Sequence, residues 1–390
     1  MGLFKDFKRF VSETMPEAVT AGEARGDVAL IDVLCIVHAF RPQANGTPVL
    51  RQLVARLVAA AAPLCAEGST LVVVFDRQST TPQQKAATQA KRHKADRKYT
   101  GEEAIALLET DMSASEWDDI LAERTVRSHI FNLMTALLME RFHQPDGELG
   151  RAARMMVHNG RTEGGPQLAV RGTEAWTEMI GEDVPDAGEA DVAIAMWART
   201  LLRDMPDARV VTLTVDSDLV RTPHLFMGCV NVCVSGTGAN DAYECSGMQV
   251  PLMMLHGGKR SSVCLSHADQ KHRLCVSTSV LAECVRTKYK LTPEEFVVVI
   301  VSLSTDFSPR CVSGIPSWAE ITRLSAAFLR STNAKVITNG ALDITVFMRM
   351  IHSVSLYKKA AKVLLNTTED KNRVEWVLRY WIRLEDVNCS

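Results

Sequence analysis

The sequence lacks several features that would assign it to a broad class. Its 390 residues contain no run of about 18 apolar residues, so a membrane-spanning helix is not expected. The N-terminal stretch MGLFKDFKRF has no apolar signal core, so we do not expect a secreted protein. The formal net charge is only −2, and any binding of nucleic acid must therefore come from local basic patches.

Cysteine is present, but not in the pattern of a disulfide scaffold. The ten cysteines are spread over the chain, and Cys35 and Cys65 lie in apolar stretches where a reduced thiol packs like a small hydrophobic side chain. We therefore expect a reducing, intracellular compartment. The stretch CLSHADQKHRLC could hold zinc, the alternative being a polar loop rich in Cys and His. Its candidate ligands are Cys264, His267, His272 and Cys275.

Short β-branched runs alternate with helical patterns along much of the chain. Amphipathic helices are expected at 50–64 and 188–202. This alternation is typical of an α/β fold in which a doubly wound, mainly parallel sheet is flanked by helices on both faces. The expected strands are 27–33 (DVALIDV), 70–75 (TLVVVF), 209–215 (RVVTLTV) and 229–234 (CVNVCV).

A long insertion follows the second expected strand. It opens with a basic segment at 83–98, continues as a helical stretch at 115–142, and ends at 145–167 in a Gly-rich stretch expected to be a mobile loop. Farther along, Thr292 and Glu295 form a capping-box pattern that predicts a helix start. A closing amphipathic helix is expected at 373–387. We expect a core of residues 1–320, with an arch insertion at 93–180, and a helical extension at 321–390.

Carboxylates follow each of the first three expected strands. Because the functional crevice of an open α/β sheet lies at the carboxyl ends of its strands, these acids can converge. Asp216 and Asp218, two residues apart, would repel each other unless a cation lay between them. Singly, an acid at an element end can be a turn former or a cap. As a set, seven such acids predict a pair of hard divalent cations. They are Asp32, Asp76, Glu189, Asp191, Asp216, Asp218 and Asp306.

The acidic motifs occur in an order that resembles a known family. The MGL start and the succession IDVLCIVHAF, VVVFDRQ, GEADVA, TVDSDLV and SLSTDFSPRCVSGIPSW resemble the 5′-nuclease superfamily of flap endonucleases and Xrn-type 5′→3′ exoribonucleases. The likeness runs from Met1 to about Trp318. It implies a PIN-like core with a helical arch, and hydrolysis of phosphodiesters that depends on two Mg²⁺ (or Mn²⁺) ions and leaves a 5′ phosphate.

The resemblance also implies roles for individual residues. One ion would be bound by Asp32, Asp76, Glu189 and Asp191, and the other mainly by Asp216, Asp218 and Asp306. Lys85 and Arg92, spaced to share nearly one face of a helix, would clamp a phosphate, the alternative being a solvated basic face. The remaining implied contacts to nucleic acid are Gly2, Gln89 and His38, the last by stacking on a base.

The substrate stays open between DNA and RNA. Chain length and the SGIP remnant favour DNA flaps, 5′ ends or junctions in replication, recombination or repair, as for the divergent enzymes of large DNA viruses. His38 and Gln89 favour an RNA-degrading nuclease, either Xrn-like or similar to the herpesvirus host-shutoff ribonuclease. A scaffold without catalysis is a third alternative. Pro316 removes an amide donor where duplex binding would use one. No sliding-clamp peptide is recognisable, and we expect no membrane partner and a location in the nucleus or at sites of viral DNA replication.

Overall fold

The computed structural model describes a defined set of residues. They are 10–20, 25–76, 99, 101–122, 124–144, 146–160, 165–173, 176–180, 190–214, 225–230, 250–254, 262–265, 274–301, 318–338 and 341–365. The chain divides into two compact units. We call the first, Met15–Met227 with Met253–Leu281, the sheet unit. The second is the helical unit, and it comprises Met1–Thr14, Gly228–Leu252 and Ala282–Ser390.

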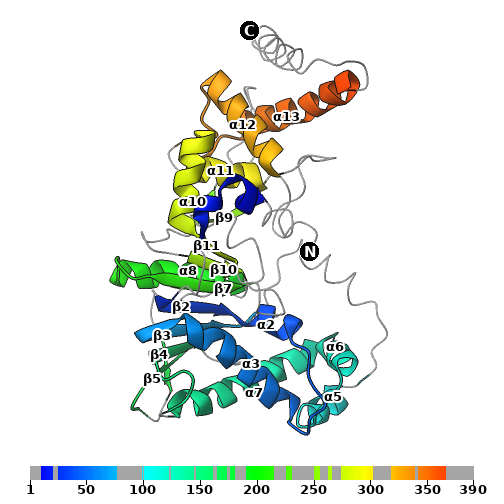
Figure 1. The fold of residues 1–390 in the computed structure, drawn as a ribbon, viewed down its shortest axis with the longest axis vertical. Helices are drawn as coiled ribbons and strands as arrows, with labels where there is room; N and C mark the ends of the chain where they lie inside the picture. The colour runs from blue at the N-terminus through cyan, green and yellow to red at the C-terminus, as the bar shows by residue number, and fades with distance from the viewer. Residues whose placement is uncertain are drawn as a thin grey trace, which may run out of the picture. The chain divides into compact units, whose positions relative to one another are not determined.

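A mixed nine-stranded sheet forms the centre of the sheet unit (Figure 1). The central strands β10, β7, β2, β3 and β4 are parallel, whereas β11 and β1 at one edge and β5 and β6 at the other pair antiparallel. In spatial order the strands are β1 (Val19–Thr20), β11 (Leu274–Ser277), β10 (Ser262–Leu265), β7 (Val210–Thr214), β2 (Gly26–Asp32), β3 (Cys65–Val74), β4 (Ala152–His158), β5 (Gln167–Val170) and β6 (Thr177–Glu178). The α/β class and the largely parallel centre agree with the prediction.

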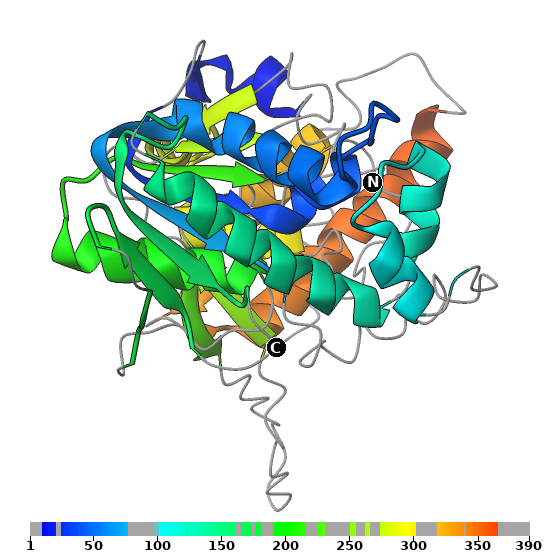
Figure 2. The ribbon, with the colours of Figure 1, turned by 90° about the horizontal axis from the view of Figure 1, so that it is seen from below.

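Helices cover both faces of this sheet. Because successive side chains of a strand point to opposite faces, Ala29 and Ile31 join one core cluster and Val28 and Leu30 another. Figure 1 shows α3 and α7 on one face and α8 on the other, and Figure 2 shows α3 and α7 lying side by side. The helices are α2 (Val33–Ala39), α3 (Val49–Ala61), α5 (Gly101–Leu107), α6 (Ala114–Ala122), α7 (Arg124–His143), α8 (Ala190–Asp204) and α10 (Thr278–Cys284), which reaches into the helical unit.

The chain reverses its direction of travel across the sheet at one point. It passes from β2 to β3 to β4, and then returns through α8 to β7, which pairs with the opposite side of β2. The connections leaving β2 and entering β7 therefore lie on opposite faces. In open α/β sheets, ligands bind outside the carboxyl ends of the strands at such a switch point. Asp32 ends β2 there, and Thr214 ends β7.

One sequence prediction of secondary structure is wrong. Residues 145–167 were expected to form a mobile loop, but Ala152–His158 is strand β4, paired in parallel with β3. Its AARMMVH segment has one β-branched residue and follows glycine-rich turns, so its sequence resembles a loop. Burial of Met155, Met156 and Val157 against the two helical layers favours the strand instead.

The helical unit contains three longer helices in its described part. They are α11 (Pro293–Val301), α12 (Trp318–Thr332) and α13 (Ile344–Leu365), accompanied by the two-stranded pair β12 (Ile337–Thr338) and β13 (Ala341–Leu342). The predicted capping box is confirmed, since Thr292 N donates to Glu295 Oε2 at 2.9 Å and Glu295 N donates to Thr292 Oγ1 at 3.2 Å. Phe10, from the helical residues 10–14, packs between Tyr289 and Phe296. A further pair, β8 (Leu225–Val230) and β9 (Val250–Met254), crosses the boundary of the units in sequence.

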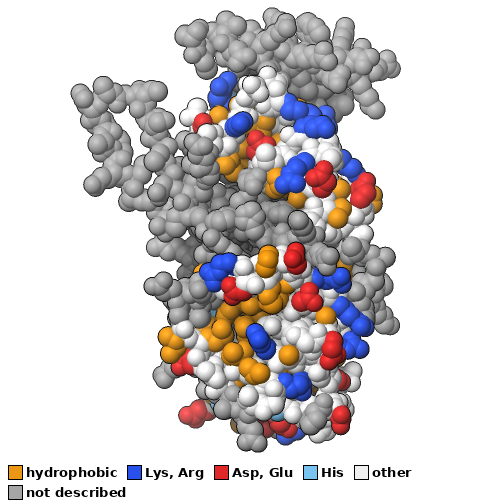
Figure 3. Space-filling model, turned by 90° about the vertical axis from the view of Figure 1, so that its left-hand side faces the viewer, with side chains coloured by type: hydrophobic (Ala, Val, Ile, Leu, Met, Phe, Trp, Pro, Cys, Tyr) orange, Lys and Arg blue, Asp and Glu red, His pale blue; other side chains and the backbone are white. Residues whose placement is uncertain are grey.

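The surface charge is mixed in sign. Figure 3 shows acidic and basic side chains interspersed around a band of hydrophobic side chains on one face. Among the described residues, no helix combines the length and apolar character that crossing a bilayer requires. On the face shown in Figure 3, the described residues therefore form no patch of a single charge sign.

The Cys65 thiol is expected to make stability fall at alkaline pH. Burial raises the pKa of this thiol, and the nearby Ser69 hydroxyl and Arg151 charge oppose that effect only in part. The unfolded chain therefore loses this proton first, and the free energy of unfolding decreases as pH rises above about 8.5. Urea denaturation of wild type and Cys65→Ala between pH 7 and 10 checks this. The alkaline loss should be smaller in the variant, and parallel profiles would contradict the prediction.

Candidate active site at the carboxyl edge of the sheet

Asp32 is held at the end of β2 by three donors. Its Oδ1 accepts from the backbone N–H groups of Leu34 at 3.0 Å and Cys35 at 3.4 Å, which makes it the N-cap of α2. Its Oδ2 accepts from Thr214 Oγ1 at 3.0 Å. Asp32 is only 6% exposed. A buried carboxylate that accepts hydrogen bonds on both of its oxygens is fixed in orientation, as a metal ligand must be.

Asp76 brings a second carboxylate to the same edge. It follows β3 by two residues, and β3 places Val74 directly opposite Asp32 in the parallel ladder. Asp76 is half-buried, and its Oδ1 accepts from Ala190 N at 2.7 Å. Ala190 is the first residue of α8, so this bond joins the carboxyl end of β3 to the start of α8, the helix on the face of the sheet away from α3 and α7. The positive N-terminal end of α8 offsets part of the repulsion between acids gathered here.

The structure thereby brings together elements that carry four of the predicted ligands. Asp32 and Asp76 are described with their side chains. Asp191 is the second residue of α8, and only the backbone of Asp191 is described. Glu189 precedes α8 directly and lies outside the described residues. The pairing of β2 with β3 and the bond from the start of α8 to Asp76 bring these elements together, while binding of an ion by their acids stays a prediction.

Several predicted residues lie outside the described part of the chain. In sequence, Asp216 and Asp218 come after β7, which ends at Thr214, and Asp306 comes after α11, which ends at Val301. Their side chains, and any role in a second metal site, stay predictions. The others outside the described residues are Gly2, Lys85, Gln89 and Arg92.

His38 is described, and its side chain is exposed. It lies in the last turn of α2, the helix that Asp32 caps at its N-terminus. At a rise of 1.5 Å per residue, six residues separate the two positions by about 9 Å along the helix. The exposed His38 therefore lies on the same helix as Asp32, at the end away from the carboxylate.

Two residues at this edge were not identified from the sequence. Thr214, the donor to Asp32, lies on the same face as Val210 in β7, and the period of two along TLTV could have indicated it. His158, 2% exposed, ends β4 directly opposite Val74, and Trp197 of α8 packs against its ring at a right angle, with centroids 6.2 Å apart. The signal for His158 was a polar residue before an Asn-Gly turn, and it was missed because β4 was not recognised.

The donor types at this edge suit a hard divalent cation. Carboxylate oxygens are the ligands that Mg²⁺ and Mn²⁺ prefer, and Asp32 and Asp76 would hold such an ion together with acids at the start of α8. Among the described side chains, no group of three or more Asp, Glu, His or Cys residues forms a metal cluster. The side chains of Glu189, Asp191, Asp216 and Asp218 lie outside the described part of the chain.

Two of the four predicted zinc ligands lie in paired strands of the sheet. Cys264 in β10 lies directly opposite Cys275 in β11, and Cys275 is 1% exposed. His267 and His272 belong to the connection between these strands and lie outside the described residues. Zinc binding by these four residues stays a prediction.

Comparison with known proteins adds no assignment. No protein-family model matches the chain, and no curated protein matches it significantly.

Proposed function

We propose that this protein is a divalent-metal-dependent nuclease that hydrolyses phosphodiesters of DNA at 5′ ends, flaps or junctions. The observation that carries the proposal is that Asp32 and Asp76 lie at the carboxyl ends of the paired strands β2 and β3, with the start of α8 bonded to Asp76. Acids from separate elements are costly to gather at one edge unless they serve a cation. The order of acidic motifs in the sequence supports the same function.

The resemblance of the acidic motifs to the 5′-nuclease superfamily supplies the roles of the residues in this proposal. Asp32 and Asp76, with Glu189 and Asp191, would hold one ion, and Asp216, Asp218 and Asp306 would mainly hold a second. Ions at this edge would supply Lewis-acid activation of the phosphate and of the attacking water. Thr214 and the amides of α2 keep the Asp32 carboxylate in one orientation. Lys85 and Arg92 would bind the phosphate through charge-assisted hydrogen bonds.

RNA is the second candidate substrate. The observation that favours it is the exposed His38 on α2, because histidine at this place is the Xrn-like choice and imidazole can stack on an unpaired base. Both candidates share the same metal chemistry. They differ in the sugar and in the strandedness of the nucleic acid that the exposed end of α2 accepts.

The test compares cleavage of a 5′-labelled DNA flap with cleavage of a 5′-monophosphorylated single-stranded RNA. Each substrate is incubated with wild type and with Asp216→Asn/Asp218→Asn, in Mg²⁺ and in EDTA. We expect cutting that requires Mg²⁺ and falls at least about 100-fold in the double variant, because the loss of two ligand charges removes several kcal/mol of stabilisation. Faster cutting of the flap supports the DNA function, and faster cutting of the RNA supports the alternative.

A matched control separates the site from a general effect of charge. Asp204→Asn/Asp207→Asn removes two exposed carboxylates near the end of α8, at the opposite edge of the sheet. Its cleavage rate should equal that of wild type. Absence of cutting of both substrates by well-folded protein with Mg²⁺ would overturn the proposal and leave a scaffold that retains an acidic edge.

A further inference from the structure

The C-terminal end of α2 is capped by side chains from elsewhere. Phe40, its C-cap residue, has extended backbone, so the helix stops without a glycine turn. The last carbonyls of a helix have no partners within it. Here Trp117 Nε1 donates to Val37 O at 3.3 Å, while Arg41 Nη1 donates to His38 O at 3.2 Å and to Phe40 O at 2.8 Å. Two side chains therefore hold the turn that carries His38.

Trp117 is a rigid member of this arrangement. It is fully buried, and its ring meets Phe40 edge-on with centroids 5.5 Å apart. Its helix, α6, begins in a defined place, because Ser113 and Glu116 form a reciprocal capping box. An aromatic pair of this geometry stabilises beyond the burial of its area. The indole N–H is consequently fixed in front of the α2 carbonyl.

The segment containing α5 and α6 is also bonded to the loop that follows α2. Gly46 N donates to Asp111 Oδ2 at 2.8 Å, and Val49 N, at the start of α3, donates to Thr110 O at 2.9 Å. Arg41 forms an exposed ion pair with Asp118 at 3.5 Å. These contacts join the insertion to both sides of the α2–α3 connection. The insertion thus supports the exposed end of α2.

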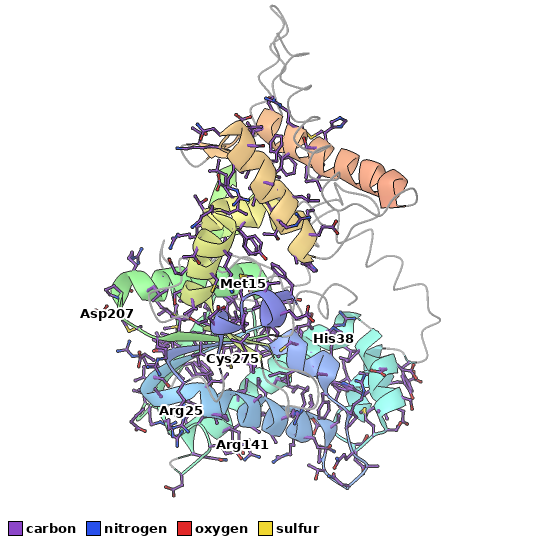
Figure 4. All side chains as sticks on the ribbon, turned by 45° about the horizontal axis from the view of Figure 1, so that its top comes forward. Met15, Arg25, His38, Arg141, Asp207 and Cys275 are labelled. Atoms are coloured by element: carbon purple, nitrogen blue, oxygen red, sulfur yellow. The ribbon has the colours of Figure 1, made fainter. Side chains whose placement is uncertain are left out.

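We infer that Trp117 and Arg41 are positioning residues that hold His38 for contact with an unpaired base of single-stranded nucleic acid. This inference rests on the proposed nuclease function. His38 lies about 9 Å along α2 from Asp32, or within about three nucleotide steps of the cleaved bond at 3.4 Å per step. Figure 4 shows His38 on the opposite side of the sheet unit from Arg25 and Asp207, which lie near the amino edge of the sheet. The substrate class implied is a strand with unstacked bases.

The test is a double-mutant cycle between His38 and the cap, by which we mean the side chains of Trp117 and Arg41 that bond the last carbonyls of α2. Arg41→Gln and Trp117→Phe are made singly and together, in wild-type and His38→Ala backgrounds. Trp117→Phe keeps an aromatic ring but removes the N–H donor. Binding of a fluorescent, 5′-phosphorylated single-stranded oligonucleotide is measured by anisotropy in Ca²⁺, and kcat and KM are measured in Mg²⁺. Circular dichroism checks that every variant is folded.

We expect the cap and His38 to act as one unit. His38→Ala should raise Kd and KM by about tenfold, within the range of one base stack, and the cap variants should raise them by about threefold or more. The kcat should change less than twofold, since the acids are untouched. In the His38→Ala background, the cap variants should cause no further rise in Kd or KM. Arg203→Gln is the matched control, because Arg203 and Arg41 are both 56% exposed and each pairs with an aspartate; its binding should equal that of wild type.

Each other outcome overturns the inference in a recognisable way. If the cap variants raise Kd equally in both backgrounds, their effect is structural or direct and does not pass through His38. If wild type cuts but His38→Ala binds normally, His38 is not a contact, and the nuclease function stands. If folded wild type neither binds nor cuts, the proposed function and this inference fail together. Because Arg41 is exposed, Arg41→Gln keeps the test valid even if Trp117→Phe unfolds.

Discussion

Asp32→Asn is expected to reduce metal-dependent cleavage by at least about 100-fold, because one charged ligand contributes several kcal/mol to a metal-assisted reaction. The fold should survive the change. Asparagine is as good an N-cap as aspartate, so its oxygen can still accept from Leu34 and Cys35, and the free energy of unfolding should stay within about 1 kcal/mol of wild type. Cleavage rates and Mn²⁺ affinity from calorimetry give two separate measurements.

The control for this change lies in the same strand. Asp27 is near the amino end of β2, where its Oδ2 accepts from Arg209 N at 2.8 Å. Asp27→Asn makes the same chemical substitution in an aspartate that also bonds a backbone amide, but at the opposite edge of the sheet. It should leave cleavage and Mn²⁺ affinity unchanged. A folded Asp32→Asn protein that cuts and binds Mn²⁺ like wild type would remove Asp32 from the site.

Trp197→Ala is expected to lower the free energy of unfolding by about 3–5 kcal/mol. Trp197 is 1% exposed and packs α8 onto the face of the sheet that includes Val28, Leu30 and Val72. A loss of this size is a large part of the roughly 5–15 kcal/mol that stabilises a typical domain. Since α8 begins at the bond between Ala190 and Asp76, we also expect Mn²⁺ affinity to fall.

Chemical denaturation followed by far-ultraviolet circular dichroism measures this loss. Ile180→Ala is the control, because Ile180 is 88% exposed and its truncation should change stability by no more than about 0.5 kcal/mol. Trp197→Phe should cost less than Trp197→Ala, since a ring still fills the space beside His158. A loss below 1 kcal/mol for Trp197→Ala would show that α8 is not held by this side chain.

Much of the sheet could be predicted because its central strands are β-branched and end in acids. The runs around Ile31, Val73 and Leu213 are short, apolar and separated by helical patterns, which is the signature of parallel strands buried on both faces. The class of fold thus followed from local pattern alone.

Other features depend on contacts distant in sequence and could not be predicted. β4 is a strand because Met155 and Val157 fill space between β3 and the helices, which no local propensity reveals. The bond from Ala190 N to Asp76 joins residues 114 positions apart. The side-chain cap of α2 by Trp117 is also remote, since 80 positions separate donor and acceptor. The sequence placed acids at the ends of these elements, but it did not reveal the contacts that hold the elements together.

The two outer strands of the sheet have a consequence for behaviour at high concentration. β1 and β6 are each only two residues long, and both residues of β6 are exposed. A long, flat outer strand offers a row of unpaired amides and carbonyls to which a second chain can add, which leads to aggregation. Strands this short provide too few such groups for a neighbouring molecule to extend the ladder. The short outer strands β1 and β6 therefore disfavour the addition of a second chain to either edge of the nine-stranded sheet.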